Sequence, residues 1–219
     1  EHAEDNSLPN ILRQSINLIA ELPTMMVNAY QIKRRVYDRS SMYFHLPTEG
    51  QSTAEHILST YRADQKFTHE EARLLDLCLL VHADHGGGNC STFTCRVLSS
   101  SGTDTYAAIS SAIGALKGPK HGYDEEFELL CSIERLAPQV FAEEKHGPKK
   151  VCANVDLFSG LIYRMLGISE DLYTPLFAIA RVPGWCAHRV EEVEFANRII
   201  RPAYKYLGKP QEYVPLEKR

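Results

Sequence analysis

Four short segments of the chain carry residue types that can bind or activate a small anionic molecule. The first runs from His82 to Asn89 with the sequence HADHGGGN, directly after an apolar run. Its imidazoles can donate hydrogen bonds or bind a metal, and its glycines let the backbone turn through positive φ or approach a ligand closely. This segment is therefore predicted to be a binding loop.

Three further segments place a reactive side chain at a helix end or on an apolar helix. His121 lies between Pro119 and Gly122, where the backbone is held by its neighbours. Asp156 opens an apolar helix, where its plainest role is that of an N-cap. Arg181 stands on an otherwise apolar stretch and needs an anionic partner. Arg201 follows near the end of the chain, in Ile-Arg-Pro.

A metal site in the first segment is the weaker interpretation. His82, Asp84, His85, Cys90 and Cys95 are all of ligand type. Their spacing fits no standard zinc pattern and lacks the i, i+4 geometry of helical zinc sites. We predict no metal, and a metal-dependent hydrolase using the two histidines stays as the alternative that metal analysis would test.

Composition narrows the class of protein. The 219 residues include 24 basic and 28 acidic side chains, so the formal charge of −4 argues against general nucleic-acid binding. The chain has no apolar run long enough to span a membrane. Six cysteines are present without a CxxC pair, which predicts reduced thiols in the cytoplasm, with Cys78 and Cys186 as small buried hydrophobic residues.

The elements that must position these residues are all predicted to be helices. Apolar residues recur at three- and four-residue steps, and we find no alternating strand pattern, so the fold is predicted to be all-α. Thr68-His69-Glu70-Glu71 is a capping box opening a helix whose last half, Leu77 to Val81, is apolar all round and is expected to be buried. The other predicted helices run from Leu8 to a stop at Pro23, from Thr24 to Val36, over 52–62, and over 105–117 after an Asp104 cap.

The second half of the chain predicts two more helices. One starts at Asn154 or Asp156 and stops at Gly167. The other is capped by Thr174 with proline next, kinks at Pro183-Gly184 and resumes to Val193.

Taken together, the four segments resemble the citrate synthase family of the bacterial kind. HADHGGGN, IGALKGPKHG, ANVDLFSGLIYRMLGI and LFAIARVPGWCAHRVEE…RIIRP occur in the family's order. Residues 1–122 and 127–206 carry the match, which is very specific because four motifs appear in sequence. The resemblance implies a large helical domain of residues 1–122 and 175–219, and a remnant of a small lid domain over 123–174.

The resemblance also implies an activity and its residues. The family condenses acetyl-CoA with oxaloacetate and hydrolyses citryl-CoA, supplying the tricarboxylic acid cycle without a cofactor or metal. Asp156 matches the base that removes the methyl proton, and His121 matches the donor to the thioester oxygen. A weakly acidic α-proton needs such a pair, since a carboxylate alone is too weak a base.

The resemblance also implies which residues bind oxaloacetate. His85 and Arg181 match oxaloacetate-binding positions, and Asn89 matches a position lining the site beside the glycines. Arg201 matches an arginine that the family supplies from the neighbouring subunit, so a homodimer is expected. The alanine-rich helix over 105–117 is a candidate for its interface, because small residues allow close helix crossing. His82 and His188 are read as supporting these groups.

The chain departs from the family after Gly122. Residues 123–127 already resemble the far end of the small domain, which places a seam near 122–127. A second catalytic histidine and much of the CoA site lie outside the match, as does the family's portion preceding Glu1. Either the protein holds further residues, or it is a catalytically incomplete, dimeric ligand-binding relative. A 2-methylcitrate synthase using propionyl-CoA is a further alternative, because one methylene is worth only ~1–3 kcal/mol of discrimination.

Overall fold

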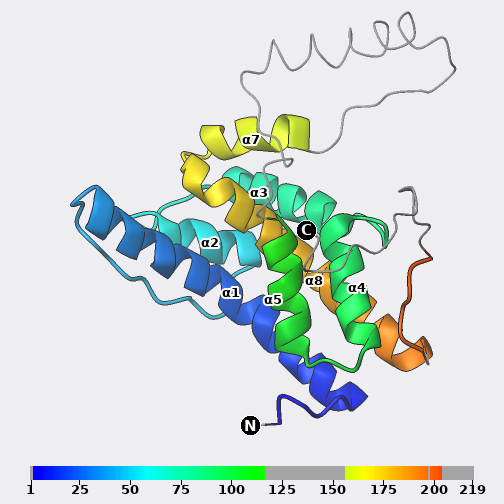
Figure 1. The fold of residues 1–219 in the computed structure, drawn as a ribbon. Coiled ribbons are helices and arrows are strands. Elements are labelled where there is room, and N and C mark those ends of the chain that lie inside the picture. Colours follow the sequence, from blue (N-terminus) through cyan, green and yellow to red (C-terminus); the bar gives the residue numbers. More distant parts are fainter. Residues whose placement is uncertain (1, 117–155, 197, 204–219) are drawn as a thin grey trace, which may run out of the picture.

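The computed structural model describes residues 2–116, 156–196 and 198–203, and every regular element in these ranges is a helix (Figure 1). The predicted all-α class is confirmed. Within the described ranges no helix is long and apolar enough to cross a membrane. The elements are α1 (Leu8–Tyr37), α2 (Thr53–Tyr61), α3 (His69–His82), α4 (Cys90–Ser100), α5 (Thr105–Leu116), α7 (Asp156–Met165), the 3₁₀ turn η1 (Glu170–Leu172) and α8 (Tyr173–Phe195).

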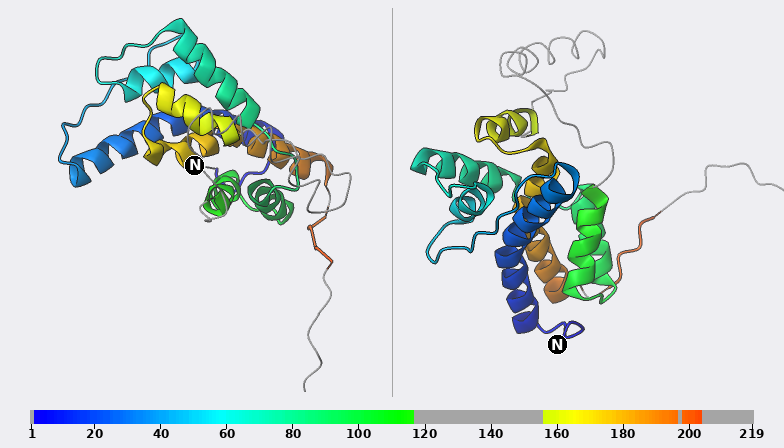
Figure 2. Two further views of the ribbon diagram at one scale, coloured as in Figure 1. Left: turned by 90° about the horizontal axis from the view of Figure 1, so that it is seen from above. Right: turned by 90° about the vertical axis from the view of Figure 1, so that its left-hand side faces the viewer.

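Helix α8 is the central element. It contacts α1, α3, α4, α5 and η1, with α4 and α5 on one side of it and α2 and α3 on the other (Figure 2). The core has two apolar clusters, and α8 contributes to both. Leu176 belongs to the cluster shared with α1, α2, α3 and α7, whereas Trp185 belongs to the cluster shared with α4 and α5. The site residues on α8 are therefore held by both halves of the core.

Local capping explains several helix starts. The Thr68 hydroxyl accepts from the Glu71 amide, and the Glu71 carboxylate accepts from the Thr68 amide, which confirms the predicted capping box. Ser52 and Glu55 form a second box at α2. Asp104 accepts from the Ala107 amide at 2.9 Å, as predicted for α5.

Two helix predictions are corrected, and one helix was not predicted. Helix α1 continues through Pro23, because its buried face runs unbroken on both sides of the proline and packing outweighs one missing hydrogen bond. Helix α4 was not predicted, since its buried side is made of small residues such as Ser91 and Ser99. Helix α8 begins at Tyr173, directly from η1, so Thr174 lies inside the helix and is not its cap.

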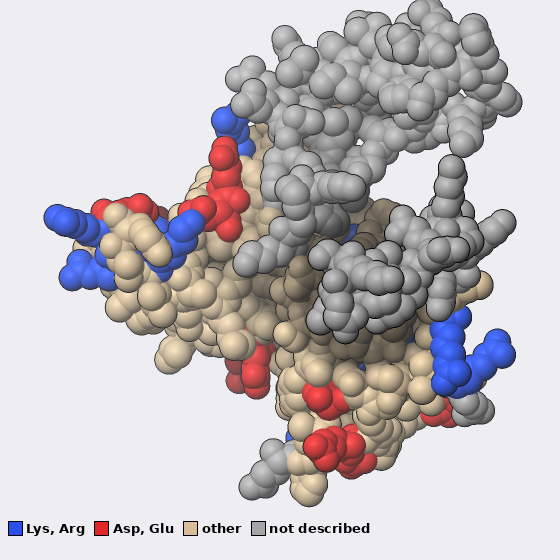
Figure 3. All heavy atoms as spheres, in the orientation of Figure 1, with Lys and Arg blue, Asp and Glu red and all other residues tan. Residues whose placement is uncertain are grey.

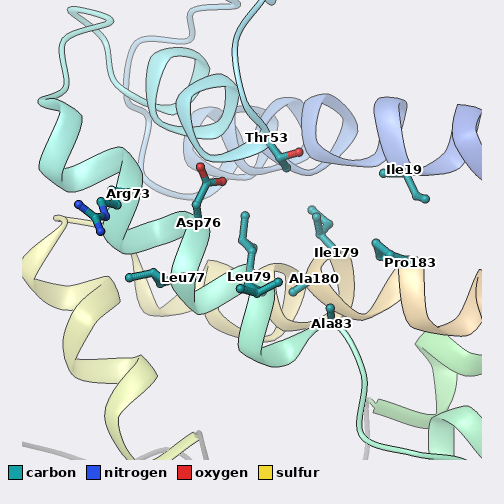
Figure 4. A pocket seen from close by; sticks show the side chains of 11 residues that line it. Ile19, Thr53, Arg73, Asp76, Leu77, Leu79, Ala83, Ile179, Ala180 and Pro183 are labelled. Atoms are coloured by element: carbon teal, nitrogen blue, oxygen red, sulfur yellow. The ribbon is translucent and has the colours of Figure 1, made fainter.

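The end of α3 is only half buried, contrary to prediction. Cys78 and Leu79 are in the core, but Leu77, Leu80 and Val81 are at least half exposed among the described residues. Leu77 and Leu80 line an apolar pocket of about 440 Å³, with Arg73 and Asp76 on its α3 side (Figure 4). The stretch from Leu77 to Val81 is apolar all round, yet its described neighbours cover only one side of it.

Charged side chains are distributed in small groups of both signs on the face drawn in Figure 3. The N-terminus lies at the end of α1 that is far from α3 (Figure 1).

Candidate functional site

The candidate site forms where the end of α3 meets the middle of α8. Gly184 of α8 lies so close to the turn after α3 that an added Cβ would be 2.2 Å from the carbonyl oxygen of Ala83. Because that neighbour is backbone, no side chain larger than hydrogen fits without moving the turn. The glycine thus allows α8 to bring Arg181 beside the loop that carries His85.

Arg181 is buried, with a relative exposure of 1%. Its Nε donates to the carbonyl oxygen of His82, and its guanidinium lies over the Phe177 ring at 4.7 Å from the ring centre. His82 is itself fully buried, with Nδ1 2.7 Å from the Cys78 carbonyl and its ring edge-on to Phe177. These contacts fix the guanidinium at the base of the loop, where a desolvated cation attracts an anion strongly.

The loop after α3 is tied to α8 by a second contact. Asp84 Oδ1 lies 3.2 Å from His188 Nε2 and accepts from the Gly86 amide at 3.1 Å. Burial alone would raise the pKa of Asp84, but hydrogen bonds from the Gly86 and His85 amides and from His188 leave this pKa below its usual value. The carboxylate is therefore charged at neutral pH and orients the loop, with Gly86 at φ +76°. His85 is exposed at this turn.

Asn89 has a visible structural role at the other end of the loop. Its side-chain oxygen accepts from the Ser91 amide at 3.1 Å and from the Ser91 hydroxyl at 2.7 Å, so it caps α4. Both of these hydrogen bonds use the side-chain oxygen of Asn89. That Asn89 also lines a substrate site stays a prediction.

The remaining predicted residues lie elsewhere. Asp156 is the first residue of α7, which packs against α3, and its side chain lies outside the described part, as does all of His121 and the seam near 122–127. Arg201 is exposed, and the adjacent Ile200 amide donates to Ser100 at the far end of α4. Since α4 has 11 residues, roughly 16 Å of helix separates that point from Asn89. The described chain does not bring Arg201 to its own His85 loop.

Sequence reasoning missed Arg96 and Glu192, which meet beside the loop. Arg96 Nε lies 3.2 Å from Glu192 Oε2, and the Glu192 side chain is 3% exposed. A signal was available, because Arg96 is the one charged residue between Cys90 and Ser100. In the described ranges, no group of three or more His, Cys, Asp or Glu side chains lies close enough to hold a metal ion.

The described part is an all-helical protein with a buried guanidinium at the base of a glycine loop that carries an imidazole, and such cationic and donor groups suit a small anionic ligand. A family model described as citrate synthase, C-terminal domain, matches residues 1–126 and 122–203. The chain belongs to the citrate synthase family.

Individual relatives agree. The citrate synthase of Synechocystis sp. is 33% identical over 96% of this chain, and citrate synthase 2 of Bacillus subtilis is 31% identical over 94%. The 2-methylcitrate synthase 2 of Corynebacterium glutamicum is 32% identical over 92%. The chain spans 66%, 68% and 66% of these relatives, about two thirds of their length.

Solved structures show the same fold. The citrate synthase of Pyrobaculum aerophilum matches with a TM-score of 0.73 at 27% identity, covering 95% of this chain and 65% of that one. The Thermoplasma acidophilum citrate synthase, solved as a ternary complex with carboxymethyl coenzyme A and oxaloacetate, matches in fold with a TM-score of 0.75 at 24% identity, covering 97% and 70%.

Proposed function

We propose that the protein is a citrate synthase, an acyltransferase that condenses acetyl-CoA with oxaloacetate and hydrolyses citryl-CoA to citrate and CoA. The observation that carries the proposal is the buried Arg181 at the base of the His85 loop. The resemblance of the sequence motifs implies that both residues bind oxaloacetate, and the chain belongs to the family that the resemblance names. Oxaloacetate is a dianion, so it needs cationic and donor groups in a site that water does not fill. No cofactor or metal is required for this chemistry.

The proposed mechanism divides the work among four residues. Asp156 removes a methyl proton of acetyl-CoA, while His121 donates to the thioester oxygen and so stabilises the enol that forms. The enol carbon then attacks the ketone carbon of oxaloacetate, which His85 and Arg181 hold. The carbonyl π bond opens as the new C–C bond forms, the enol oxygen returns its proton, and the former ketone oxygen takes up a proton to become the hydroxyl group. Water finally hydrolyses the thioester and releases CoA.

A homodimer completes the proposed site. Arg201 lies about one α4 length from Asn89 of its own chain and is exposed, which suits an arginine that reaches a partner's oxaloacetate. The cytoplasm is the proposed location, because all four cysteines in the described ranges are free thiols.

The test compares binding with turnover. In the proposed enzyme, Asp156→Ala lowers turnover, followed as CoA thiol release, about 10²–10⁴-fold while leaving the oxaloacetate Kd nearly unchanged, because it removes only the base. Arg181→Ala weakens oxaloacetate binding. Loss of binding together with rate in Asp156→Ala contradicts the base assignment, and an unchanged oxaloacetate Kd in Arg181→Ala contradicts the substrate role. Binding of oxaloacetate with no turnover by the unaltered chain would identify the incomplete, ligand-binding relative.

A second candidate function is that of a 2-methylcitrate synthase. It is favoured by the similarity to the two Corynebacterium glutamicum 2-methylcitrate synthases, at 32% and 31% identity. The two functions differ by one methylene of the acyl group, so the ratio of kcat/KM for propionyl-CoA and acetyl-CoA decides between them.

A further inference from the structure

The three consecutive glycines of the loop differ in backbone conformation and in what surrounds them. Gly86 has φ +76°, a conformation that favours glycine. Gly88 has neither a positive φ nor any atom within 4 Å of where its Cβ would be. Gly87 has no positive φ either, but a Cβ there would lie 2.6 Å from Nη1 of Arg96. The space that a side chain would occupy at Gly87 is thus filled by the Arg96 guanidinium.

Arg96 is held in that space by a buried carboxylate. Its Nε lies 3.2 Å from Oε2 of Glu192, and the side-chain exposures are 38% for Arg96 and 3% for Glu192. A hydrogen bond between two charged groups is stronger than one between neutral groups, and the buried carboxylate would be costly to leave unpaired. The arginine is therefore anchored from α8 and reaches from α4 across the loop.

The same face of α8 holds the first half of the loop. His188 and Glu192 are four residues apart on this helix and lie one above the other. His188 contacts Asp84, which accepts from the Gly86 amide, while Glu192 holds the arginine that lies on Gly87. Between these two contacts is a glycine-rich stretch that would otherwise be the most flexible part of the site.

We propose that Arg96, fixed by Glu192, is a positioning residue that preorganises the glycine loop for oxaloacetate. The inference rests on the proposed function, because it assigns the loop to that substrate. Arg96 acts through Gly87 and does not itself touch the reacting atoms. Removing it frees the loop, so that substrate binding must then order the loop again, which weakens affinity.

The experiment measures loop mobility and affinity separately. In the full chain, Arg96→Met is expected to increase amide hydrogen exchange at Gly86, Gly87 and Gly88, and to weaken oxaloacetate binding about tenfold by calorimetry. Exchange in α2 should not change. Arg73→Met, which removes an exposed arginine from α3, is the matched control and should alter neither quantity. If Arg96→Met leaves Glu192 unpaired and the protein unfolds, the paired variant Arg96→Met with Glu192→Gln tests the same prediction.

A double-mutant cycle tests the direct contact. Gly87→Ala should weaken oxaloacetate binding by up to about tenfold in the parent chain, because the methyl group displaces the guanidinium, and only slightly in the Arg96→Met chain. Gly88→Ala should have the same effect in both backgrounds. Additive effects of Gly87→Ala and Arg96→Met would overturn the inference.

The outcomes separate this inference from the proposed function. Normal oxaloacetate binding with unchanged loop exchange in Arg96→Met overturns the positioning role and leaves the proposed function standing. A parent chain that binds no oxaloacetate overturns the proposed function and, with it, the oxaloacetate role of Arg96. In that case, increased hydrogen exchange of the loop in Arg96→Met would still support the contact between Arg96 and the loop, without a role in oxaloacetate binding.

Discussion

Buried polar side chains in this protein are not all satisfied, and Gln31 of α1 is the clearest case. It is fully buried, and within the described ranges neither its amide nitrogen nor its amide oxygen has a hydrogen-bond partner. A buried amide without partners loses its hydration without compensation, at a cost of roughly 1–3 kcal/mol. In the site, Arg181 and His82 each have a backbone carbonyl as a partner.

The first prediction at this scale is that Gln31→Met stabilises the protein. Methionine has a similar shape and no amide, so the free energy of unfolding should rise by about 1 kcal/mol in urea titrations. Gln51→Met is the control, because the Gln51 oxygen accepts from the Thr48 amide and the Ser59 hydroxyl. That change should destabilise or have no effect. A loss of stability in Gln31→Met would show that its amide is satisfied in solution.

Two arginines of α8 show how far the role of a single residue could be predicted from the sequence. Arg181 was singled out because a charge on an apolar helix needs a partner, and it is buried at the α3 loop. Arg189 is equally buried, yet three neutral oxygens, from Thr105, Ser99 and Asn6, accept from it. Burial lowers its pKa. The residue type alone could not distinguish these roles, because the partners come from distant parts of the chain.

At the scale of elements, one ion pair connects three helices. Arg62, at the end of α2, donates to both carboxylate oxygens of Glu71 in α3, at 2.9 and 2.8 Å. It also donates at 2.8 Å to the Leu166 carbonyl, which follows α7. Arg62 holds the pKa of Glu71 well below its usual range, at about 2, and the Thr68 amide adds to the effect. The linkage therefore fixes α7, the helix that begins at Asp156.

We predict that this linkage is lost in acid. Because the folded pKa of Glu71 is lowered, its contribution to stability is complete above pH ~4.5 and disappears as the pH falls towards 2. Glu71→Gln should therefore be less stable than the parent by about 1–2 kcal/mol at pH 7, and nearly equal to it at pH 2.

Thermal denaturation across this pH range checks the prediction. Glu49→Gln, in the exposed loop after α1, is the control and should follow the parent at every pH. A constant difference between Glu71→Gln and the parent down to pH 2 would contradict it.

Elements with strong local signals were predicted well. The capping box at Thr68, the Asp104 cap and the stop at Gly167, where φ is +70°, are determined by neighbouring residues. The path through Pro23 and the helix α4 were not predicted. At Pro23, packing of α1 against α8 outweighs the local effect of the proline. In α4, the side that packs in the core consists of small, mostly polar residues, so the sequence shows no apolar stripe.

At the scale of the whole molecule, α5 has a face that residues 2–116, 156–196 and 198–203 leave open. Ala108, Ile109 and Ala112 pack in the core, whereas Tyr106, Ser110 and Ile113 are exposed at helical spacing. Beside them, Gly114 has no atom within 4 Å of where its Cβ would be. Small residues next to exposed apolar ones suit a close crossing with a second copy of the same helix.

The corresponding prediction is that Ile113→Arg prevents the proposed dimer. Sedimentation velocity should show a dimer for the parent and a monomer for the variant, with unchanged helical circular dichroism. Leu46→Arg is the control, because Leu46 is 87% exposed in a loop far from α5 in the sequence. Its dimer should persist. A dimer that survives in Ile113→Arg would place the interface on another surface.

The contact of Gly184 with Ala83 fixes the distance between α8 and the loop after α3 through main-chain atoms alone. Two backbones touch there, so the spacing between the His85 loop and Arg181 does not depend on which rotamer any side chain adopts. Such a spacing is as stiff as the helices themselves and has no adjustable part. In the proposed enzyme, a substrate of different length is therefore expected to be accommodated by parts of the site other than this contact.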